Sequence, residues 1–549
     1  MRPPNAKPVT GSLMSLFGPS LPAIGRAFAL SVVVISDGAV ADQVSPTEEP
    51  VQGATVTAPD GQPLGGATIS AQIDSLRRVT RFANTLGYVD LRGLVREDVP
   101  FTVSYPGFED RVFSGASLSP HIQLEADTEF IEKLPSEAWL GLLPEGSQKR
   151  EFIVNCATCH ELGYGRIMVQ GRTRNANEWL GAITAMRAMD AYEVIPPDFD
   201  DEEYAGWLSK HLSDSAVRTL MPARVEAADA LASIEITEYA LPEKDSLPHD
   251  LVIGPDGRIW ITAFFYDELW ALSPETGEIE RYSVDARSEV NAQPRALEFD
   301  DQGRLWLVNG GTESVLEFDI ESGEYVELDV GMYAHSIDLG PTGRVWVNDY
   351  FAAEERLAVI DPDDQSVELV PVSRSGLPRT EGLPLPYGLQ VDSKERVYST
   401  QLAANTLVRY DPHTKTSELW QMPAENSGPR RPGLDSRDGL WIPEFNTGYI
   451  TFFDPNNERF QRYRLGSSST GLYDIEVNQA NDDVWATGSL ESTLIRYRPS
   501  SGDILKVPLP TEPAYTRHIA IDEETGTVWT AYSSLPAAKP RVARLRMLE

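Results

Sequence analysis

The chain has 549 residues, 83 acidic against 47 basic, and a formal net charge of -36. Its length predicts several domains, and its 41% apolar content is that of a globular protein, which argues against disorder and collagen. The negative charge disfavours nucleic acid and anionic membrane surfaces as partners.

Residues 1–41 are predicted to be a secretory signal peptide. Scattered basic residues, the last of them Arg26, precede an apolar run at 27–35, and Ala-Val-Ala follows at 39–41. The run is too short to span a bilayer of roughly 30 Å. Cleavage after Ala41 would leave an exported chain, periplasmic or extracellular, with no integral membrane segment. An ordinary N-terminus or an uncleaved anchor is the alternative.

Residues 42–126 are predicted to form a small β-sandwich. Alternating β-branched residues at 51–57 and 67–73 lie between glycine turns. With the Tyr-Pro-Gly-Phe stretch at 105–108, this pattern resembles carboxypeptidase regulatory-like domains. The resemblance implies a packing or adhesion module and no peptidase activity.

Residues 127–228 are predicted to form a compact helical unit. Trp179, Ile183 and Met186 recur at i, i+4 and i+7, so that one face of a helix over 178–189 is apolar. A second helix is expected over 202–212, with Tyr204, Trp207, Leu208 and His211 on one face.

The only two cysteines lie within Cys156-Ala-Thr-Cys159-His160. Two thiols at this spacing, followed by a histidine, form the attachment sequence for haem c, in which Cys156 and Cys159 bind the porphyrin and His160 ligates the iron. A redox-active dithiol and half of a zinc site are the alternatives, but the first requires a βαβ setting and the second another pair of thiolates.

The helical unit resembles class I-like cytochrome c domains, through Leu-Pro-Glu-Gly at 143–146 and Arg-Thr with Glu-Trp over 172–179. This resemblance implies that Met186 is the distal iron ligand. A simple packing role remains open for this methionine, since Met fills irregular gaps. The other options are Met189, Met168, His211 or an open coordination site.

Residues 229–549 are predicted to be a seven-bladed β-propeller. An aromatic residue recurs at intervals of 40 to 52 residues, each time after a turn and an alternating strand, which predicts blades of four short strands. A strand over 234–239 precedes the first blade and is expected to complete the seventh, closing the ring. The chain as a whole is therefore a multidomain, mainly β protein. The recurring aromatic residues are Trp260, Trp306, Trp346, Tyr398, Trp441, Trp485 and Trp529.

The propeller resembles streptogramin lyase-like (virginiamycin B lyase-like) and NHL-type proteins, through repeats such as Pro-His-Asp-Leu-Val-Ile-Gly-Pro-Asp-Gly at 248–257. The resemblance implies a magnesium-assisted lyase with His249 or His335 as the base and Glu444 or Asp349 at the metal. Hydrogen-bonded turn residues are the alternative for these side chains.

One equivalent position near the start of each innermost strand is expected to face the channel mouth. An anionic or oxygen-rich ligand would meet histidine, arginine and tyrosine there. The seven residues are His249, Arg295, His335, Tyr387, Pro432, Tyr473 and Arg517.

Three functions follow from this organisation. The first is a periplasmic protein with one covalent haem c that transfers electrons between an external acceptor and a substrate or docked redox partner at the propeller channel. The second is a lyase with an accessory haem domain, and magnesium enters only in this case. The third is a non-catalytic binding or envelope protein, because the propeller fold alone does not define an activity.

Overall fold

A computed structural model describes residues 52–94, 99–157, 160–188, 195, 199–223, 225–284, 290–351, 355–372, 384–534 and 538–548. The predicted signal peptide lies outside these residues. No helix in these ranges is both long and apolar enough to cross a membrane.

The N-terminal segment forms two small sheets around an apolar core that includes Val56, Ile69 and Phe101. One sheet has the strand order β4-β1-β7, and the other contains β3-β2-β5-β6. The strands are β1 (Gly53–Thr57), β2 (Thr68–Gln72), β3 (Arg77–Phe82), β4 (Tyr88–Asp90), β5 (Pro100–Ser104), β6 (Arg111–Ser114) and β7 (His121–Gln123).

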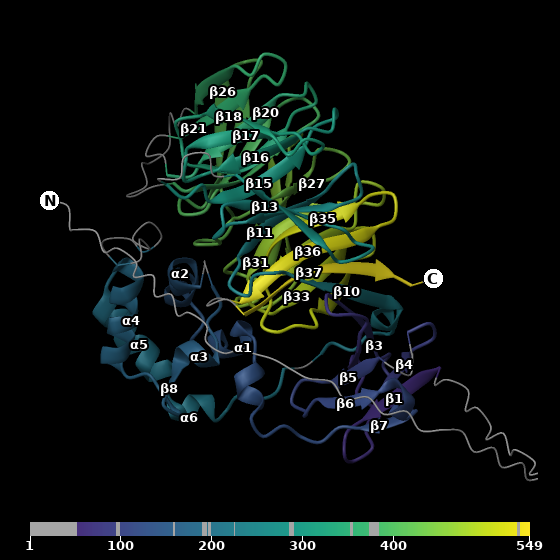
Figure 1. The fold of residues 1–549 in the computed structure, drawn as a ribbon. Coiled ribbons are helices and arrows are strands. Elements are labelled where there is room, and N and C mark those ends of the chain that lie inside the picture. Colours follow the sequence, from purple (N-terminus) through teal and green to yellow (C-terminus); the bar gives the residue numbers. More distant parts are fainter. Residues whose placement is uncertain are drawn as a thin grey trace, which may run out of the picture. The chain divides into compact units, whose positions relative to one another are not determined.

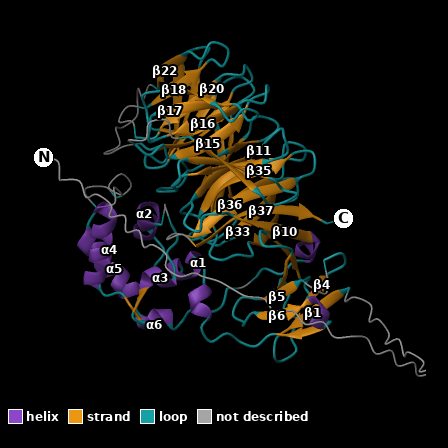
Figure 2. Ribbon diagram, viewed as in Figure 1, coloured by secondary structure: helices purple, strands orange, loops and turns teal. Residues whose placement is uncertain are grey.

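Helices follow between residues 136 and 217, as the purple ribbons in Figure 2 show. Trp179 and Ile183 are buried on one face of α4, and Met186 packs against the same core. Both helices predicted from apolar spacing are present, as α4 and α5. The elements are α1 (Ser136–Leu140), α2 (Ser147–Cys156), α3 (Tyr164–Ile167), β8 (Met168–Val169), β9 (Arg172–Thr173), α4 (Ala176–Ala188), α5 (Asp201–His211) and α6 (Asp214–Val217).

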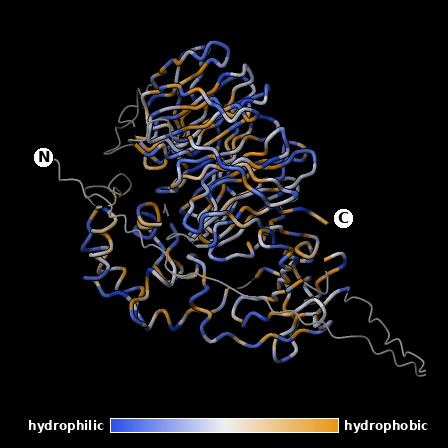
Figure 3. Tube along the Cα trace, viewed as in Figure 1, coloured by the Kyte–Doolittle hydropathy of each residue, from blue (hydrophilic) through white to orange (hydrophobic). Residues whose placement is uncertain are grey.

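The remaining strands form a seven-bladed β-propeller, as the sequence predicts (Figure 1). Hydrophobic and hydrophilic segments alternate along its strands (Figure 3), the pattern expected where sheets pack face to face. The first four blades are β11 (Pro248–Ile253), β12 (Ile259–Ala263), β13 (Glu268–Leu272) and β14 (Ile279–Ser283); β15 (Pro294–Phe299), β16 (Leu305–Asn309), β17 (Ser314–Phe318) and β18 (Tyr325–Asp329); β19 (Ala334–Leu339), β20 (Val345–Asp349), β21 (Arg356–Ile360) and β22 (Val367–Pro371); β23 (Pro386–Val391), β24 (Val397–Gln401), β25 (Thr406–Asp411) and β26 (Thr416–Gln421).

The ring closes in the seventh blade, which combines both ends of the propeller sequence. Strand β10 (Ile234–Ala240) pairs antiparallel with the last strand, which confirms the predicted closure. Blades five to seven are β27 (Gly433–Leu434), β28 (Leu440–Glu444), β29 (Tyr449–Asp454) and β30 (Arg459–Arg464); β31 (Leu472–Val477), β32 (Val484–Gly488), β33 (Thr493–Arg498) and β34 (Asp503–Pro508); β35 (Tyr515–Asp522), β36 (Thr527–Ser534), β37 (Ala538–Met547) and β10.

Six of the seven recurring aromatic residues are the second residue of the second strand in their blade, and Trp529 is the third residue of β36. The buried Trp306 indole donates to Asp300 in the preceding turn at 3.1 Å, and Trp260 donates to Asp256 at 3.4 Å. A buried N–H left without an acceptor is costly, so the turn carboxylate explains why Trp306 and Trp260 follow Asp-containing turns. In the first blade, Gly257 completes the turn with φ of 78°.

The sequence does not reveal that the sandwich and the seventh blade share one sheet. Strand β3 pairs antiparallel with β10, giving eight strands in the order β35-β36-β37-β10-β3-β2-β5-β6. The outer edge of β10 is therefore covered by β3. Glu235 on β10, 3% exposed, is bound by Arg81 at 2.8 Å and by Arg546 at 2.5 Å.

We expect Arg81→Ala to lower the free energy of unfolding by about 2–3 kcal/mol, because the buried Glu235 carboxylate loses one of its two cations. The exposed Arg92 is paired with Asp90 across a turn, so Arg92→Ala should cost less than about 1 kcal/mol. Thermal unfolding, with hydrogen exchange of the β10 amides, measures both. Equal effects of the two substitutions would show that the β3–β10 ion pair does not stabilise the shared sheet.

Candidate functional site

The predicted haem-attachment sequence lies at the end of a helix. Cys156 is the last residue of α2, whereas Cys159 lies outside the described residues. The Nδ1 atom of His160 lies 2.9 Å from the carbonyl oxygen of Glu161, and this contact directs Nε2 toward other partners. Burial, assisted by Arg166, lowers the pKa of His160 to about 4, so the imidazole is neutral, the form that binds metal.

Cys156, His160 and Met186 line one cavity of about 800 Å³. Cys156 and His160 come from one stretch of sequence at and just after the end of α2, whereas Met186 comes from α4. The apolar part of the wall includes Phe152, Leu162, Trp179, Ile183, Ile195 and Leu208.

Some buried polar groups on the wall of the same cavity can still donate hydrogen bonds. In the part of the chain that the structure describes, neither Trp179 Nε1 nor Asn155 Nδ2, both buried, has a hydrogen-bond partner. Arg166 and Arg174 add positive charge to the wall, which also contains the carboxylates of Glu132, Glu161 and Glu178. An apolar cavity of this size with unsatisfied donors and two guanidinium groups fits a macrocycle with carboxylate substituents. The residues present therefore fit a haem.

The alternative distal ligands differ in position. Met168 lies in β8 and packs against the core of the helical unit, while His211 ends α5 with its ring 5.8 Å from the Trp207 ring. Met189 is outside the described residues. Of these candidates and Met186, Met186 is the one on the described cavity wall.

Four of the seven residues expected at the channel mouth lie in a contiguous cluster. The ring centroids of His249 and His335 are 6.5 Å apart, and those of His335 and Tyr387 are 4.4 Å apart. Tyr387 and Tyr473 share a hydrogen bond between their hydroxyl groups. All four are the second residues of innermost strands, so the repeat brings them together.

His335 has a defined tautomer and one ring nitrogen without a partner. Nδ1 lies 2.9 Å from the Tyr387 carbonyl oxygen and therefore carries the proton. Nε2 is buried, and no residue described here forms a hydrogen bond with it. Burial, reinforced by the nearby Arg295 charge, holds the pKa of His335 well below its usual value.

Asp250 joins the histidine cluster to the channel. One carboxylate oxygen lies 2.7 Å from His249 Nδ1, and the other accepts from Arg431 Nη1 at 2.6 Å. Burial alone would raise the pKa of Asp250, but the Arg431 charge and the neighbouring His518 and His249 hold it well below its usual value. Burial lowers the pKa of His249 to about 3 against the opposing effect of Asp250.

The channel mouth contacts the haem-attachment sequence directly. The Tyr515 hydroxyl donates to the carbonyl oxygen of Ala157, next to Cys156, at 3.3 Å. Tyr515, Tyr473 and Tyr387 belong to the same buried cluster as Phe152 of the helical unit. The Tyr515 and Tyr473 ring centroids are 6.1 Å apart, and those of Tyr473 and Tyr387 are 5.8 Å apart.

The two carboxylates predicted to bind magnesium form ion pairs with arginine side chains. Glu444, at the end of β28, accepts from Arg462 at 2.6 Å and from Thr451 at 2.5 Å. Asp349 is paired with Arg356 at 2.7 Å. Within the described ranges, no group of three or more His, Cys, Asp or Glu side chains is arranged to hold a metal ion. A role for Glu444 at a metal therefore stays a prediction.

Sequence reasoning missed two arginines at the mouth, Arg430 and Arg431. The strand alignment places Pro432 at the equivalent position, and the short innermost strand β27 begins only after it. Arg430 lies over the rings of Phe445 and Tyr473, at 3.9 and 4.2 Å. The adjacent arginines in Gly-Pro-Arg-Arg-Pro at 428–432 were the available signal.

Comparison with known structures defines the propeller as streptogramin B lyase-like in fold. A streptogramin B lyase aligns with a TM-score of 0.51 and 18% identity, covering 58% of this chain and the whole of the lyase. Virginiamycin B lyase from Staphylococcus aureus aligns with a TM-score of 0.50 and 18% identity over 57% of this chain and all of its own. A catalytically inactive histidine-to-alanine variant of that lyase, with quinupristin, gives the same values.

At this identity the likeness establishes the fold alone. No family model matches the sequence, and no curated protein matches it. The resemblances to cytochrome c and to carboxypeptidase regulatory-like domains therefore remain predictions.

Proposed function

We propose that the chain is an exported c-type haem protein that exchanges electrons between a small molecule at the propeller mouth and an external acceptor. The observation that carries the proposal is the shared cavity: Cys156, His160 and Met186 line one largely apolar space of about 800 Å³. Such a space suits a haem held by its iron ligands and by the thioethers of the attachment sequence.

Each group at the cavity has a role in this proposal. Cys156 and Cys159 hold the porphyrin covalently, and His160 and Met186 ligate the iron through Nε2 and the thioether sulfur. Trp179, with Arg166 and Arg174, binds the carboxylate substituents. The haem supplies one-electron oxidation and reduction, while the apolar wall excludes water and favours a higher potential.

The contact between the two modules supports coupling to the propeller. Because Tyr515 reaches the Ala157 carbonyl, a molecule at the His249–His335 cluster would be separated from the haem by packed aromatic side chains. The buried, neutral His335 offers Nε2 as a hydrogen-bond acceptor to such a molecule. The external acceptor is a docked redox protein, and the acidic chain suits one with a basic surface.

A reduced-minus-oxidised spectrum of the purified chain tests the proposal. Sharp c-type bands that remain with the protein after acid-acetone extraction are expected, and Cys156→Ser with Cys159→Ser should abolish them. Absence of the bands, or extraction of the pigment into the organic layer, would refute the proposal.

The lyase fold favours a second candidate, a C–O lyase with His335 or His249 as the base. Magnesium-dependent opening of a cyclic depsipeptide, lost in His335→Ala, would support it. The pairing of Glu444 with Arg462 weighs against Glu444 as a metal ligand here.

A further inference from the structure

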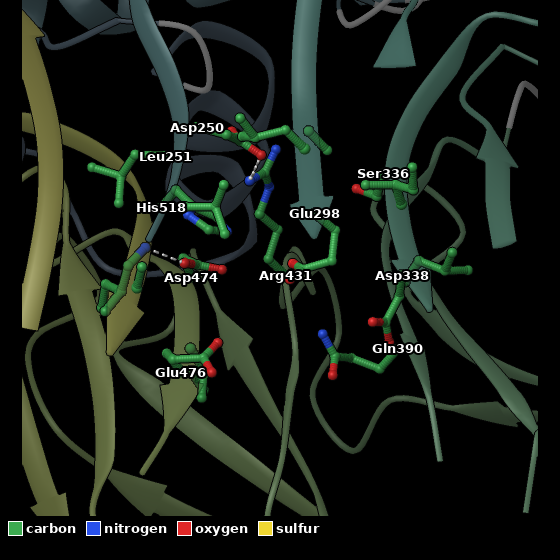
Figure 4. A pocket seen from close by; sticks show the side chains of 18 of the residues that line it. Asp250, Leu251, Glu298, Ser336, Asp338, Gln390, Arg431, Asp474, Glu476 and His518 are labelled. Atoms are coloured by element: carbon green, nitrogen blue, oxygen red, sulfur yellow. Dashed lines mark hydrogen bonds and ion pairs between the residues drawn. The ribbon is translucent and has the colours of Figure 1, made fainter. Parts of the chain in front are cut away.

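The central channel of the propeller contains a second cavity, of about 280 Å³, which Figure 4 shows from close by. Asp250, Ser336, Arg431, Asp474 and His518 lie on its wall near the mouth. Further along the innermost strands, the fifth residue of four strands adds Glu298, Asp338, Gln390 and Glu476. Aliphatic side chains such as Leu297, Ile337 and Leu389 form the wall between them.

Arg431 presents an unused binding edge to this cavity. Its side chain is buried, with the residue 6% exposed, and Nη1 is engaged by Asp250 at 2.6 Å. Nε and Nη2 have no hydrogen-bond partner among the residues that the structure describes. These two nitrogens form the side of a guanidinium group that binds a carboxylate through two parallel hydrogen bonds.

The surroundings of Arg431 favour an anion with an apolar chain. His518 Nδ1, on the same wall, is also buried without a partner in the described part of the chain. Burial raises the pKa of Asp474, which weakens its repulsion of an incoming anion. Leaving buried donors unsatisfied is unfavourable, and a bound carboxylate would offset this cost.

We infer that the mouth of the channel binds a small organic carboxylate, with its two oxygens on Nε and Nη2 of Arg431 and its chain among the aliphatic wall residues. The identification of this molecule with the electron-exchanging substrate rests on the proposed function. The binding site itself rests on the channel alone. The volume of the cavity limits the ligand to a few carbon atoms beyond the carboxylate.

Isothermal titration of the full chain with butyrate tests the site, with butyramide as a neutral analogue and inorganic phosphate as an oxyanion without a chain. We expect butyrate to bind and butyramide to fail. Arg431→Lys should weaken butyrate binding by about tenfold or more, since lysine retains a positive charge for Asp250 but lacks the two-nitrogen edge. Arg409→Lys, on β25, should bind butyrate normally.

Equal binding of butyrate by the Arg431→Lys and unsubstituted chains would overturn the inference. So would equal binding of butyrate and butyramide, or binding of phosphate without butyrate. The haem spectrum of the same samples separates the two proposals: butyrate binding without haem refutes only the proposed function, and haem without butyrate binding refutes only the channel site.

Discussion

Met186→His is expected to lower the midpoint potential of the haem by a few tenths of a volt. Axial ligands set haem potentials over a range of roughly 0.8 V, and a thioether stabilises the reduced iron more than a second imidazole does. Met186 lies on the cavity wall with Cys156 and His160, so a histidine on the same α4 face can approach the iron. Potentiometric titration of the purified protein, followed by visible spectroscopy, measures the shift.

Met168→Leu serves as the matched control, because Met168 packs against the same core from β8. We expect its potential and long-wavelength sulfur-to-iron absorption to match those of the unsubstituted chain. If Met168→Leu abolishes that absorption while Met186→His leaves the potential unchanged, Met168 is the distal ligand. Loss of the absorption in Met186→Ala would support the assignment independently.

The propeller was predictable from sequence because the contacts that define its repeat are made between residues close together in the sequence. Six of the seven blades place the aromatic residue after a carboxylate-containing turn, as with Trp306 and Asp300, whereas in the third blade Trp346 donates to Glu395 of the next blade. The closing strand β10 was predictable for the same reason, since it was a strand without a blade of its own.

The relationships between modules were not predictable from sequence. The pairing of β3 with β10 joins positions about 160 residues apart, and nothing in the alternation of β3 indicates which partner its edge meets. The contact of Tyr515 with Ala157 joins positions still further apart. Periodicity fixes which face of a strand is buried but leaves its long-range partner open.

The candidate functional sites were also predictable only in part. The predicted attachment sequence at 156–160 is recognisable because its residues are consecutive, and its haem stays a prediction. The cluster of His249 and His335 was predictable because each blade repeats the same strand. Arg431 was missed because its blade departs from that repeat. The channel carboxylates Glu298, Asp338 and Glu476 were missed because their burial depends on ring closure, although they share the fifth position of their strands.

Those channel carboxylates should make the protein less stable as the pH rises. Burial raises the pKa of Glu298 to about 8 from its usual 4.5 and that of Asp338 to about 7 from 3.8, and it raises the pKa of Glu476 well above its usual value. Between the usual and the raised pKa values, the unfolded chain has released these protons while the folded chain retains them. Unfolding is therefore increasingly favoured from about pH 4 to pH 8.

Glu298→Gln and Asp338→Asn should each remove that residue's share of this dependence, because the neutral amides do not titrate. One pKa unit corresponds to about 1.4 kcal/mol, so each substitution should stabilise the chain by up to a few kcal/mol at pH 9 and by little at pH 4. Thermal midpoints recorded between pH 4 and pH 9 measure the effect, with the exposed Glu321→Gln as the control. If both amide variants follow the pH profile of the unsubstituted chain, the channel carboxylates are ionised in the folded protein. Arg431, which lines the same channel, would then be a cation that stabilises them.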